Sequence, residues 1–335
     1  MIRAALKWVF LITGTTIGAG YASGREIWQF FGSGSELAII LFTILFILSV
    51  NMILKISYEA RTSDYLPLLR KIVGNKFAKI YDYLILIYLF CVTLVMVAGS
   101  GASFQGYGFP FWWGTGIICL GLVLIFRKGI NELLVINEIL MPLLIISLFV
   151  VLIVFMRDEQ ISLVTDWRRQ GNWMSALPFT ALNVLPLIAV LGAIGGKIKT
   201  KGEIYIASIS SGLMLGILSF IYNKSLVHLS SQTMIDEIPL FAIINNYDDK
   251  IMLLMTIMLW LAIFTTAAAT LLGMVTRIKN NFNVSIGKIV SIILLCILPF
   301  TGIGFAQLVA VIYPLYGILN LYVLVKLIFY PIWNK

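Results

Sequence analysis

Two apolar stretches of this chain contain residues that interrupt helices, and an interrupted helix exposes backbone groups that can bind ligands. The first stretch has glycine at four positions within eleven, Gly14, Gly18, Gly20 and Gly24. Because glycine costs a helix about 1 kcal/mol relative to alanine, we expect unwinding near Gly18. The second stretch contains Pro186, which removes one helical hydrogen bond and crowds the preceding turn. Freed N–H groups can hold a carboxylate, and freed carbonyl groups can hold a cation.

Half of the chain separates the two interruptions. Gly18 and Pro186 are 186 − 18 = 168 positions apart in a sequence of 335 residues. Matching interruptions in two halves are typical of inverted-repeat transporters, whose binding sites lie between the broken helices. Alternatively, the i, i+4 glycine spacing serves close helix packing, and the proline only kinks its helix.

The composition places these stretches in a membrane. The chain is 60% hydrophobic and 12% charged, with a mean hydropathy of +1.00, whereas soluble domains carry about 25% charged residues. So much apolar surface requires a hydrocarbon environment. The single histidine, His228, has no neighbouring Cys or His, so no metal site of that kind is expected. The three cysteines lie within apolar runs and predict helix packing rather than disulfides.

Apolar runs of about 20 residues predict ten transmembrane helices. Six uncharged runs cover 37–54, 83–126, 173–196, 204–223, 251–276 and 289–325, and the second and last are each long enough for two helices. Spans at about 7–31 and 129–156 complete the count. Lys and Arg gather in the connections on one side, so both termini are predicted to be cytoplasmic. The net charge of +9 therefore follows membrane topology and predicts no nucleic-acid partner.

The first-helix residues resemble a known superfamily. Gly14-Thr-Thr-Ile-Gly-Ala-Gly20 is similar to the first-helix signature of the amino acid–polyamine–organocation (APC) superfamily, which has the LeuT-type fold. The longer stretch from Gly18 to Phe31 resembles a small, largely uncharacterised bacterial family of predicted amino acid permeases. The resemblance implies one all-α domain over residues 1–335 in the bacterial cytoplasmic membrane. It would consist of two inverted repeats of five helices, at 1–156 and 173–335, with helices 1 and 6 interrupted.

The resemblance also implies a sodium site between the first and eighth helices. Its ligands would be the carbonyl groups of Gly14, Ile17 and Ala262 and the hydroxyl groups of Thr265 and Thr266. The eighth-helix spacing fits, because the carbonyl of residue i points toward residues i+3 and i+4. Five oxygens without a carboxylate suit a monovalent cation, although both threonines could instead bond back to their own helix. Tyr21 stands where some relatives have the Asn of a second sodium site, so we expect one cation at most and no other cofactor.

Three charged residues are candidates for gating or coupling. Glu138 lies ten residues past Lys128, about 15 Å into the fifth span, where a carboxyl group is costly and could carry a coupling proton. Alternatively, it bonds to a neighbouring helix. Arg25 resembles the outer-gate arginine of LeuT-type transporters, which pairs with a carboxylate across the vestibule. Glu26 could form a local pair with it, or both could lie at the interface with their charges in water.

The predicted solute pocket lies between the first and sixth helices. Its expected residues are Ile17, Gly18, Ala19, Gly20 and Tyr21 from the first helix, and Phe179, Thr180, Asn183 and Val184 from the sixth.

These patterns favour a symporter that moves a small amino acid, or a related carboxylate-bearing solute, with sodium. A proton-coupled permease that uses Glu138 is one alternative. A membrane sensor on the same fold is another, since the pocket suits it equally well. An enzyme is not expected, because the sequence has one histidine and contains neither H-E-x-x-H nor G-x-S-x-G.

Overall fold

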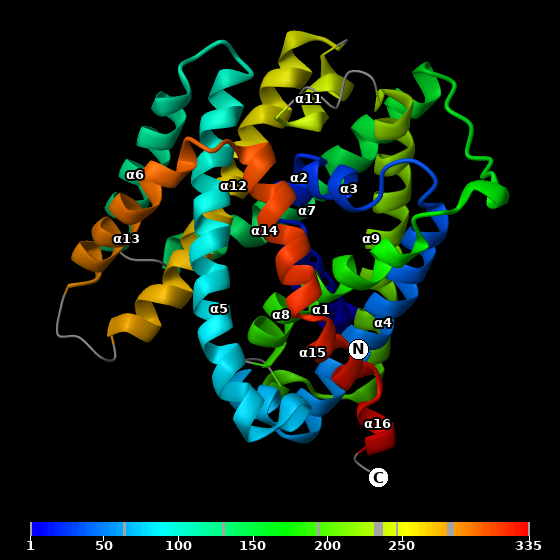
Figure 1. Cartoon of the computed structure of the whole chain (residues 1–335), viewed down its shortest axis with the longest axis vertical. Coiled ribbons are helices and arrows are strands. Elements are labelled where there is room, and N and C mark those ends of the chain that lie inside the picture. The colour runs from blue at the N-terminus through cyan, green and yellow to red at the C-terminus, as the bar shows by residue number, and fades with distance from the viewer. Residues whose placement is uncertain are drawn as a thin grey trace.

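A computed structural model describes residues 2–62, 65–128, 131–192, 195–230, 237–245, 247–279 and 285–333. The described residues form helices and no β-strand. Both ends of the chain lie at the same end of the molecule, and the small helix α11 (Pro239–Ile244) lies at the opposite end (Figure 1). This arrangement agrees with an even number of membrane spans.

The first predicted span consists of three helical pieces, α1 (Ile2–Thr16), α2 (Ala19–Ala22) and α3 (Arg25–Phe30). The other spans are α4 (Glu36–Glu59), α5 (Tyr65–Gln105), α6 (Phe111–Lys128), α7 (Asn131–Asp158), α8 (Ala176–Gly192), α9 (Lys201–His228), α12 (Asp249–Lys279), α13 (Ile286–Thr301) and α14 (Phe305–Leu319). Short helices η1 (Trp167–Arg169), η2 (Trp173–Ser175), η3 (Gly195–Lys197), α15 (Leu321–Ile328) and α16 (Tyr330–Trp333) occupy connections and the C-terminal end.

Length and hydropathy support these spans. Among the described residues, six helices are each long and apolar enough to cross a membrane, namely α4, α5, α7, α8 with η2, α9 and α12. The shorter α6 is also apolar. Helices α13 and α14 are bent by 107° at Gly302–Gly304, where the sequence predicts a turn between two spans. Together with the broken first span, these helices accommodate the ten predicted spans.

The sixth span differs from the prediction. Helix α8 continues through Pro186 to Gly192, so the expected break at the proline is not present. A proline removes only its own N–H, which frees the carbonyl of Leu182, and the remaining helical hydrogen bonds on both sides are intact. Dense packing against α4 and α14 keeps this helix together.

The helices form two packed groups. In one group, α1, α4, α8 and α9 pack against one another; in the other, the long α5 packs along α12, with α6, α7 and α13 beside them. Figure 1 shows α6 and α13 on one side of the molecule and α4 and α9 on the other. Five phenylalanines join α3, α4 and α8, with the Phe42 and Phe179 rings 4.7 Å apart. The others in this cluster are Phe30, Phe31 and Phe46.

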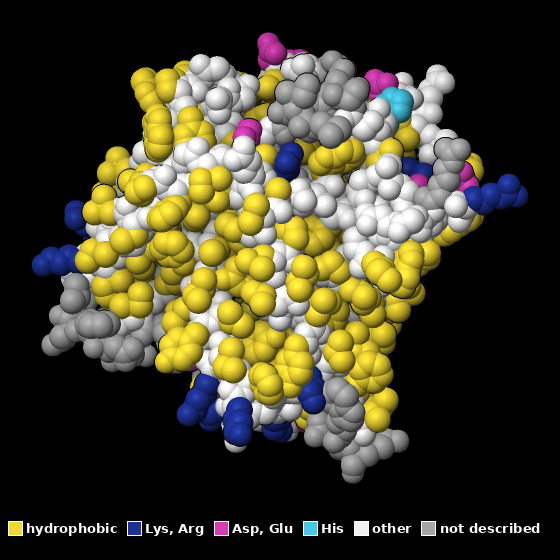
Figure 2. All heavy atoms as spheres, viewed as in Figure 1, with side chains coloured by type: hydrophobic (Ala, Val, Ile, Leu, Met, Phe, Trp, Pro, Cys, Tyr) yellow, Lys and Arg dark blue, Asp and Glu magenta, His cyan; other side chains and the backbone are white. Residues whose placement is uncertain are grey.

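The surface matches a membrane-spanning molecule. Figure 2 shows apolar side chains over the middle of the visible face and Lys and Arg grouped at the end that carries the termini. This distribution follows the positive-inside rule and places that end in the cytoplasm.

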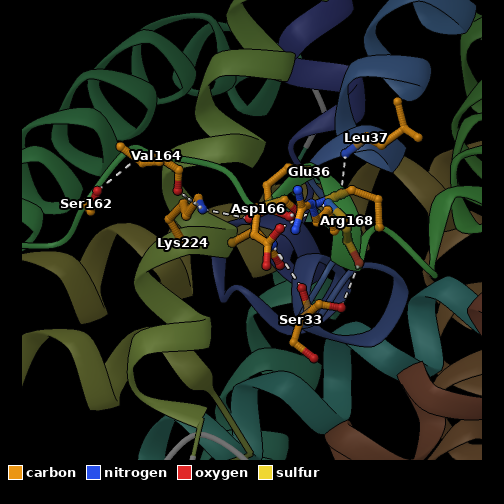
Figure 3. Close-up of polar contacts among 12 residues, drawn as sticks. Ser33, Glu36, Leu37, Ser162, Val164, Asp166, Arg168 and Lys224 are labelled. Carbon is orange, nitrogen blue, oxygen red and sulfur yellow. Dashed lines mark hydrogen bonds and ion pairs between the residues drawn. The ribbon is translucent and has the colours of Figure 1, made fainter.

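A polar cluster holds the outer ends of α4 and α9 to the connection between α7 and α8 (Figure 3). The Nζ of Lys224 on α9 lies 2.6 Å from Oε1 of Glu36 at the start of α4, and it also donates to the carbonyl of Val164 at 3.2 Å. Gln170 donates to the other Glu36 oxygen at 2.7 Å. The Lys224 and Glu36 side chains are only 14% and 12% exposed, so this ion pair is shielded from water.

The substitution Lys224→Met should destabilise the protein, because it leaves the shielded Glu36 carboxylate without its charged partner. We expect a loss of about 1–3 kcal/mol, measured as a lower melting temperature of the detergent-solubilised protein. The matched control is His228→Ala, which removes the pair between His228 and Glu159, whose side chains are both 41% exposed. An equal effect of both substitutions would contradict the role of shielding.

Candidate functional site at the break in the first helix

The first helix breaks at Ile17 and Gly18, as the glycine pattern predicts. Helix α1 ends at Thr16, and Gly18 has an extended backbone, with φ −83° and ψ −175°, before α2 begins. The Gly18 N–H donates to the carbonyl of Thr16 at 3.0 Å instead of to that of Gly14. The regular i to i−4 ladder therefore stops at this point.

The break leaves carbonyl oxygens without donors. Among the described residues, no backbone N–H donates to the carbonyl of Gly14, Thr15 or Ile17. The N–H that would reach Ile17 in a continuous helix belongs to Tyr21, and it lies near the Glu26 carboxylate instead. Two of the three free carbonyl groups, Gly14 and Ile17, are those expected to bind sodium.

Helix α12 supplies the facing hydroxyl groups. Helix α2 packs on α12, and a Cβ built on Gly18 would lie 3.9 Å from the Thr266 methyl group and 4.0 Å from its hydroxyl oxygen. Thr266 is partly exposed, whereas Thr265 and Ala262 are buried. The Thr265 hydroxyl donates to the Ala262 carbonyl at 3.1 Å, which is the local bond considered as the alternative to cation binding. A hydroxyl group that donates one bond still has lone pairs that can accept a cation.

Helix α7 closes the third side of this region. A Cβ built on Gly14 would lie 3.2 Å from the Met141 side chain, so α1 and α7 are in close contact here. Glu138 falls in the same helix, but its side chain lies outside the part of the chain that the structure describes. The described residues contain no group of three or more His, Cys, Asp or Glu side chains that could hold a metal ion.

Glu26 points back toward the break. It is 6% exposed, and its carboxylate lies against Gly20, where a Cβ would collide with Oε1 of Glu26. In the described part of the chain, no Lys, Arg or His forms an ion pair with this carboxylate. Tyr88 of α5 and Tyr313 of α14 are close enough to interact electrostatically with it. Glu26 is therefore an inner group of the site rather than part of a local pair with Arg25.

Arg25, the first residue of the same short helix, faces the outer end of the molecule. Its guanidinium group interacts electrostatically with Glu237, which precedes α11. Oε2 of Glu237 accepts the Ala306 N–H at the start of α14 at 2.6 Å. The turn between α2 and α3 is also bonded here, because the Leu240 N–H donates to the Ser23 carbonyl at 2.9 Å. These bonds close the outer end of the site.

The side chains of two predicted pocket residues point away from the break. The Tyr21 hydroxyl bonds to the Ser219 hydroxyl at 2.7 Å and to the Leu215 carbonyl at 3.1 Å, so its ring points into α9. The Phe179 ring is buried in the phenylalanine cluster. Both side chains are large; the hydroxyl bonds to α9 hold Tyr21 away from the break, and the packing of α8 on α4 does the same for Phe179.

The remaining predicted pocket residues lie at the first-helix break and on α8. Ile17 and Ala19 are fully buried, whereas Gly18 is partly exposed. On α8, Thr180 donates to Ala176 at 2.6 Å and Asn183 Nδ2 donates to Phe179 at 2.8 Å, both within their own helix, and Val184 is buried. Sequence reasoning missed Glu237 and Tyr313, because nothing in their local sequence signals that the fold brings them to the first helix.

The substitution Gly20→Ala should disrupt the site, because the new methyl group would collide with the Glu26 carboxylate. We expect a stability loss of about 1–3 kcal/mol, from the thermal melting of purified protein in sodium-free buffer. Gly18→Ala is the matched control, since its methyl group would meet only Thr266 at ordinary contact distance. If both variants melt at the same temperature, the proposed position of Glu26 is wrong.

Comparison with known proteins identifies the fold and the family. No family model matches the chain. The structure superposes on MhsT in complex with L-phenylalanine with a TM-score of 0.68 and 16% identity, covering 95% of this chain and 87% of that chain. It superposes on the inward-facing conformation of Mhp1 with a TM-score of 0.66 and 14% identity, covering 94% and 73%. Both have the LeuT-type fold, which this chain therefore shares.

Sequence comparison finds two relatives in Bacillus subtilis strain 168. The uncharacterized membrane protein YkvI is 27% identical over 328 residues, which cover 95% of this chain and 93% of that protein. The uncharacterized protein YyaD is 46% identical over 333 residues, which cover 99% of this chain and 98% of that protein. The chain, a multi-pass membrane protein with the LeuT-type fold, belongs to the family of YyaD.

Proposed function

We propose that this protein is a secondary active transporter that couples the movement of a small amino acid to sodium. The observation that carries the proposal is the break at Ile17 and Gly18, which leaves carbonyl oxygens without donors beside Thr266 of α12. In a membrane, irregular backbone is tolerated only where it is buried in protein or lines a cavity. A bound cation would satisfy the free carbonyl groups and join the first helix to α12.

The available oxygens favour a monovalent cation. The proposed ligands are the carbonyl groups of Gly14, Ile17 and Ala262 and the hydroxyl groups of Thr265 and Thr266. Divalent ions normally recruit carboxylates, and this set contains none.

An amino acid is the proposed solute. The structure of MhsT that shares this fold contains L-phenylalanine. In our proposal the solute contacts the backbone from Ile17 to Gly20 and the α8 residues Thr180, Asn183 and Val184. Membership in the APC superfamily is part of the same proposal, supported by the first-helix motif.

The proposed transport cycle moves one helix group against the other. The first span, α4, α8 and α9 rock as a unit, since the phenylalanine cluster and the cluster around Glu36 tie them together. Cation binding would draw the first span toward α12 and complete the solute site. The bonds of Ser23 and Glu237 at the outer end would open when the site faces outward.

The test is uptake of labelled amino acids into proteoliposomes that contain the purified protein. An inward sodium gradient should drive uptake, and an equal potassium gradient should not. The absence of uptake under any cation gradient, with folded protein, would contradict transport. Thermal stabilisation by an amino acid in that case would favour a sensor on the same fold.

The double substitution Thr265→Ala and Thr266→Ala should abolish the sodium dependence of uptake, because it removes two of the five proposed ligands. The matched control is Thr270→Ala on the same helix, whose hydroxyl bonds to that of Thr93 on α5 at 2.8 Å and lies away from the break. Sodium dependence that survives in the double variant would contradict the cation site.

Proton coupling through Glu26 is a second candidate, which the burial of this carboxyl group without an ion-pair partner favours. Burial in the membrane disfavours the charged form of a carboxyl group. Movement of Glu26 toward water would therefore be accompanied by release of its proton. Glu138 remains a predicted alternative for the same role.

The substitution Glu26→Gln separates these candidates, because glutamine keeps the shape of the side chain and cannot release a proton. If a proton is coupled at Glu26, uptake driven by a pH gradient should disappear, while exchange of internal for external solute continues. If sodium alone is coupled, the sodium-driven component should persist in the variant. Pairing with Glu138→Gln shows which carboxyl group is used.

A further inference from the structure

A groove that the transport proposal does not use lies at the cytoplasmic ends of α4 and α9. Two lysines, two tyrosines, one asparagine and one isoleucine line it, namely Lys55, Lys201, Tyr58, Tyr205, Asn51 and Ile204. Both lysines are exposed, and they come from different helices. The groove therefore combines two cationic groups with the hydroxyl groups of two tyrosines.

The packing of α4 on α9 explains where the groove begins. Deeper in the membrane the two helices touch, since a Cβ on Gly212 would collide with Ile47 and one on Gly216 would collide with Thr43. Next along the interface, Asn51 Nδ2 donates to the Ser208 hydroxyl at 3.3 Å. Beyond this point the facing residues are lysine and tyrosine instead of glycine, and the groove opens toward the cytoplasm.

The acidic side chains nearby do not neutralise the groove. Glu203 of α9 is buried and turned away, and it accepts bonds from Trp8 Nε1 at 3.1 Å and from the Thr200 hydroxyl at 3.3 Å. Glu59 of α4 is exposed and does not line the groove. A third cation adjoins it, since the Arg61 guanidinium lies 5.1 Å from the centre of the Tyr58 ring. This combination suits a phosphate group.

Apolar side chains continue from the groove along the lipid-facing surface. On α9 they are Ile209, Leu213 and Ile217, each one turn beyond the last and all exposed, starting from Tyr205. On α4 the exposed residues Ile40, Ile44 and Leu48 form a second row with the same spacing. The groove thus has a cationic end at the membrane surface and two apolar rows that lead into the hydrocarbon layer.

We propose that this groove binds the phosphate headgroup of an anionic phospholipid, whose acyl chains lie along the two apolar rows. Basic pockets between transmembrane helices on the cytoplasmic side are suited to anionic headgroups. Free phosphate would use the same lysines but would gain nothing from the rows. Because α4 and α9 belong to the proposed moving group, the lipid would anchor that group at the inner surface.

The test compares phospholipids on delipidated, detergent-solubilised protein, with bound lipid counted by native mass spectrometry. Wild-type protein should bind phosphatidylglycerol in preference to phosphatidylcholine. Each lysine near a membrane surface contributes about fivefold to anionic-lipid affinity. The double variant Lys55→Gln with Lys201→Gln should therefore bind phosphatidylglycerol roughly thirtyfold more weakly than the wild-type protein. The matched control is Lys76→Gln with Lys79→Gln, two exposed lysines of α5 outside the groove, which removes the same charge from the cytoplasmic side and should keep the preference.

Two further measurements, on a charge-preserving variant and with inorganic phosphate, test the proposal. Lys55→Arg with Lys201→Arg preserves the charge and should retain the preference, so a loss in the glutamine variant cannot be attributed to misfolding when both variants melt alike in phosphatidylcholine. Inorganic phosphate has the same charged group but no acyl chains, so at millimolar concentration it should not displace the bound lipid. Displacement by phosphate, equal loss in the α5 control, or no preference in wild-type protein would each overturn the proposal.

Discussion

The structure of the site depends on how the backbone at the start of α2 is satisfied inside the membrane. An unpaired backbone group in hydrocarbon costs several kcal/mol, so the polar groups at the break favour any partner within reach. The Gly18 N–H donates to Thr16, and the Tyr21 N–H lies near the Glu26 carboxylate. These choices leave the carbonyl groups of Gly14 and Ile17 without donors, which makes the break electronegative and suited to a cation. Gly20 is required because a side chain there would occupy the space of the Glu26 carboxylate.

Hydrogen bonds and ionic contacts hold the first span at its outer end and at its inner end. At the outer end, Glu237 lies between Arg25 and the start of α14, and Tyr222 donates to the Ala22 carbonyl at 3.0 Å. At the inner end, Trp8 of α1 donates to Glu203 of α9, which moves with it in the proposed cycle. The first span is thus bonded to its own group at its two ends, and α12 faces it across the break. A cation is the component that would connect the two groups.

Much of the fold follows from the sequence, and the limits have physical causes. Apolar runs and the distribution of Lys and Arg predict the spans and their orientation, because the bilayer sets both. The glycines predict the first break. The predicted break at Pro186 is wrong, because one lost hydrogen bond does not unwind a helix that is packed on several sides. The inward turn of Glu26, the packing of the Tyr21 ring against α9 and the approach of Glu237 depend on contacts between distant segments, which local sequence does not encode. The division into repeats at 1–156 and 173–335 stays a prediction.

The central claim is that the free carbonyl groups at the first-helix break and the hydroxyl groups of α12 form one cation site. The most direct measurement is equilibrium binding of radioactive sodium to the purified protein, in potassium-containing buffer and without solute. The account predicts saturable binding of one sodium ion per chain, which an excess of unlabelled sodium displaces. The absence of saturable binding in protein that is folded and monodisperse would contradict it, and coupling through Glu26 would then be the better explanation of the break.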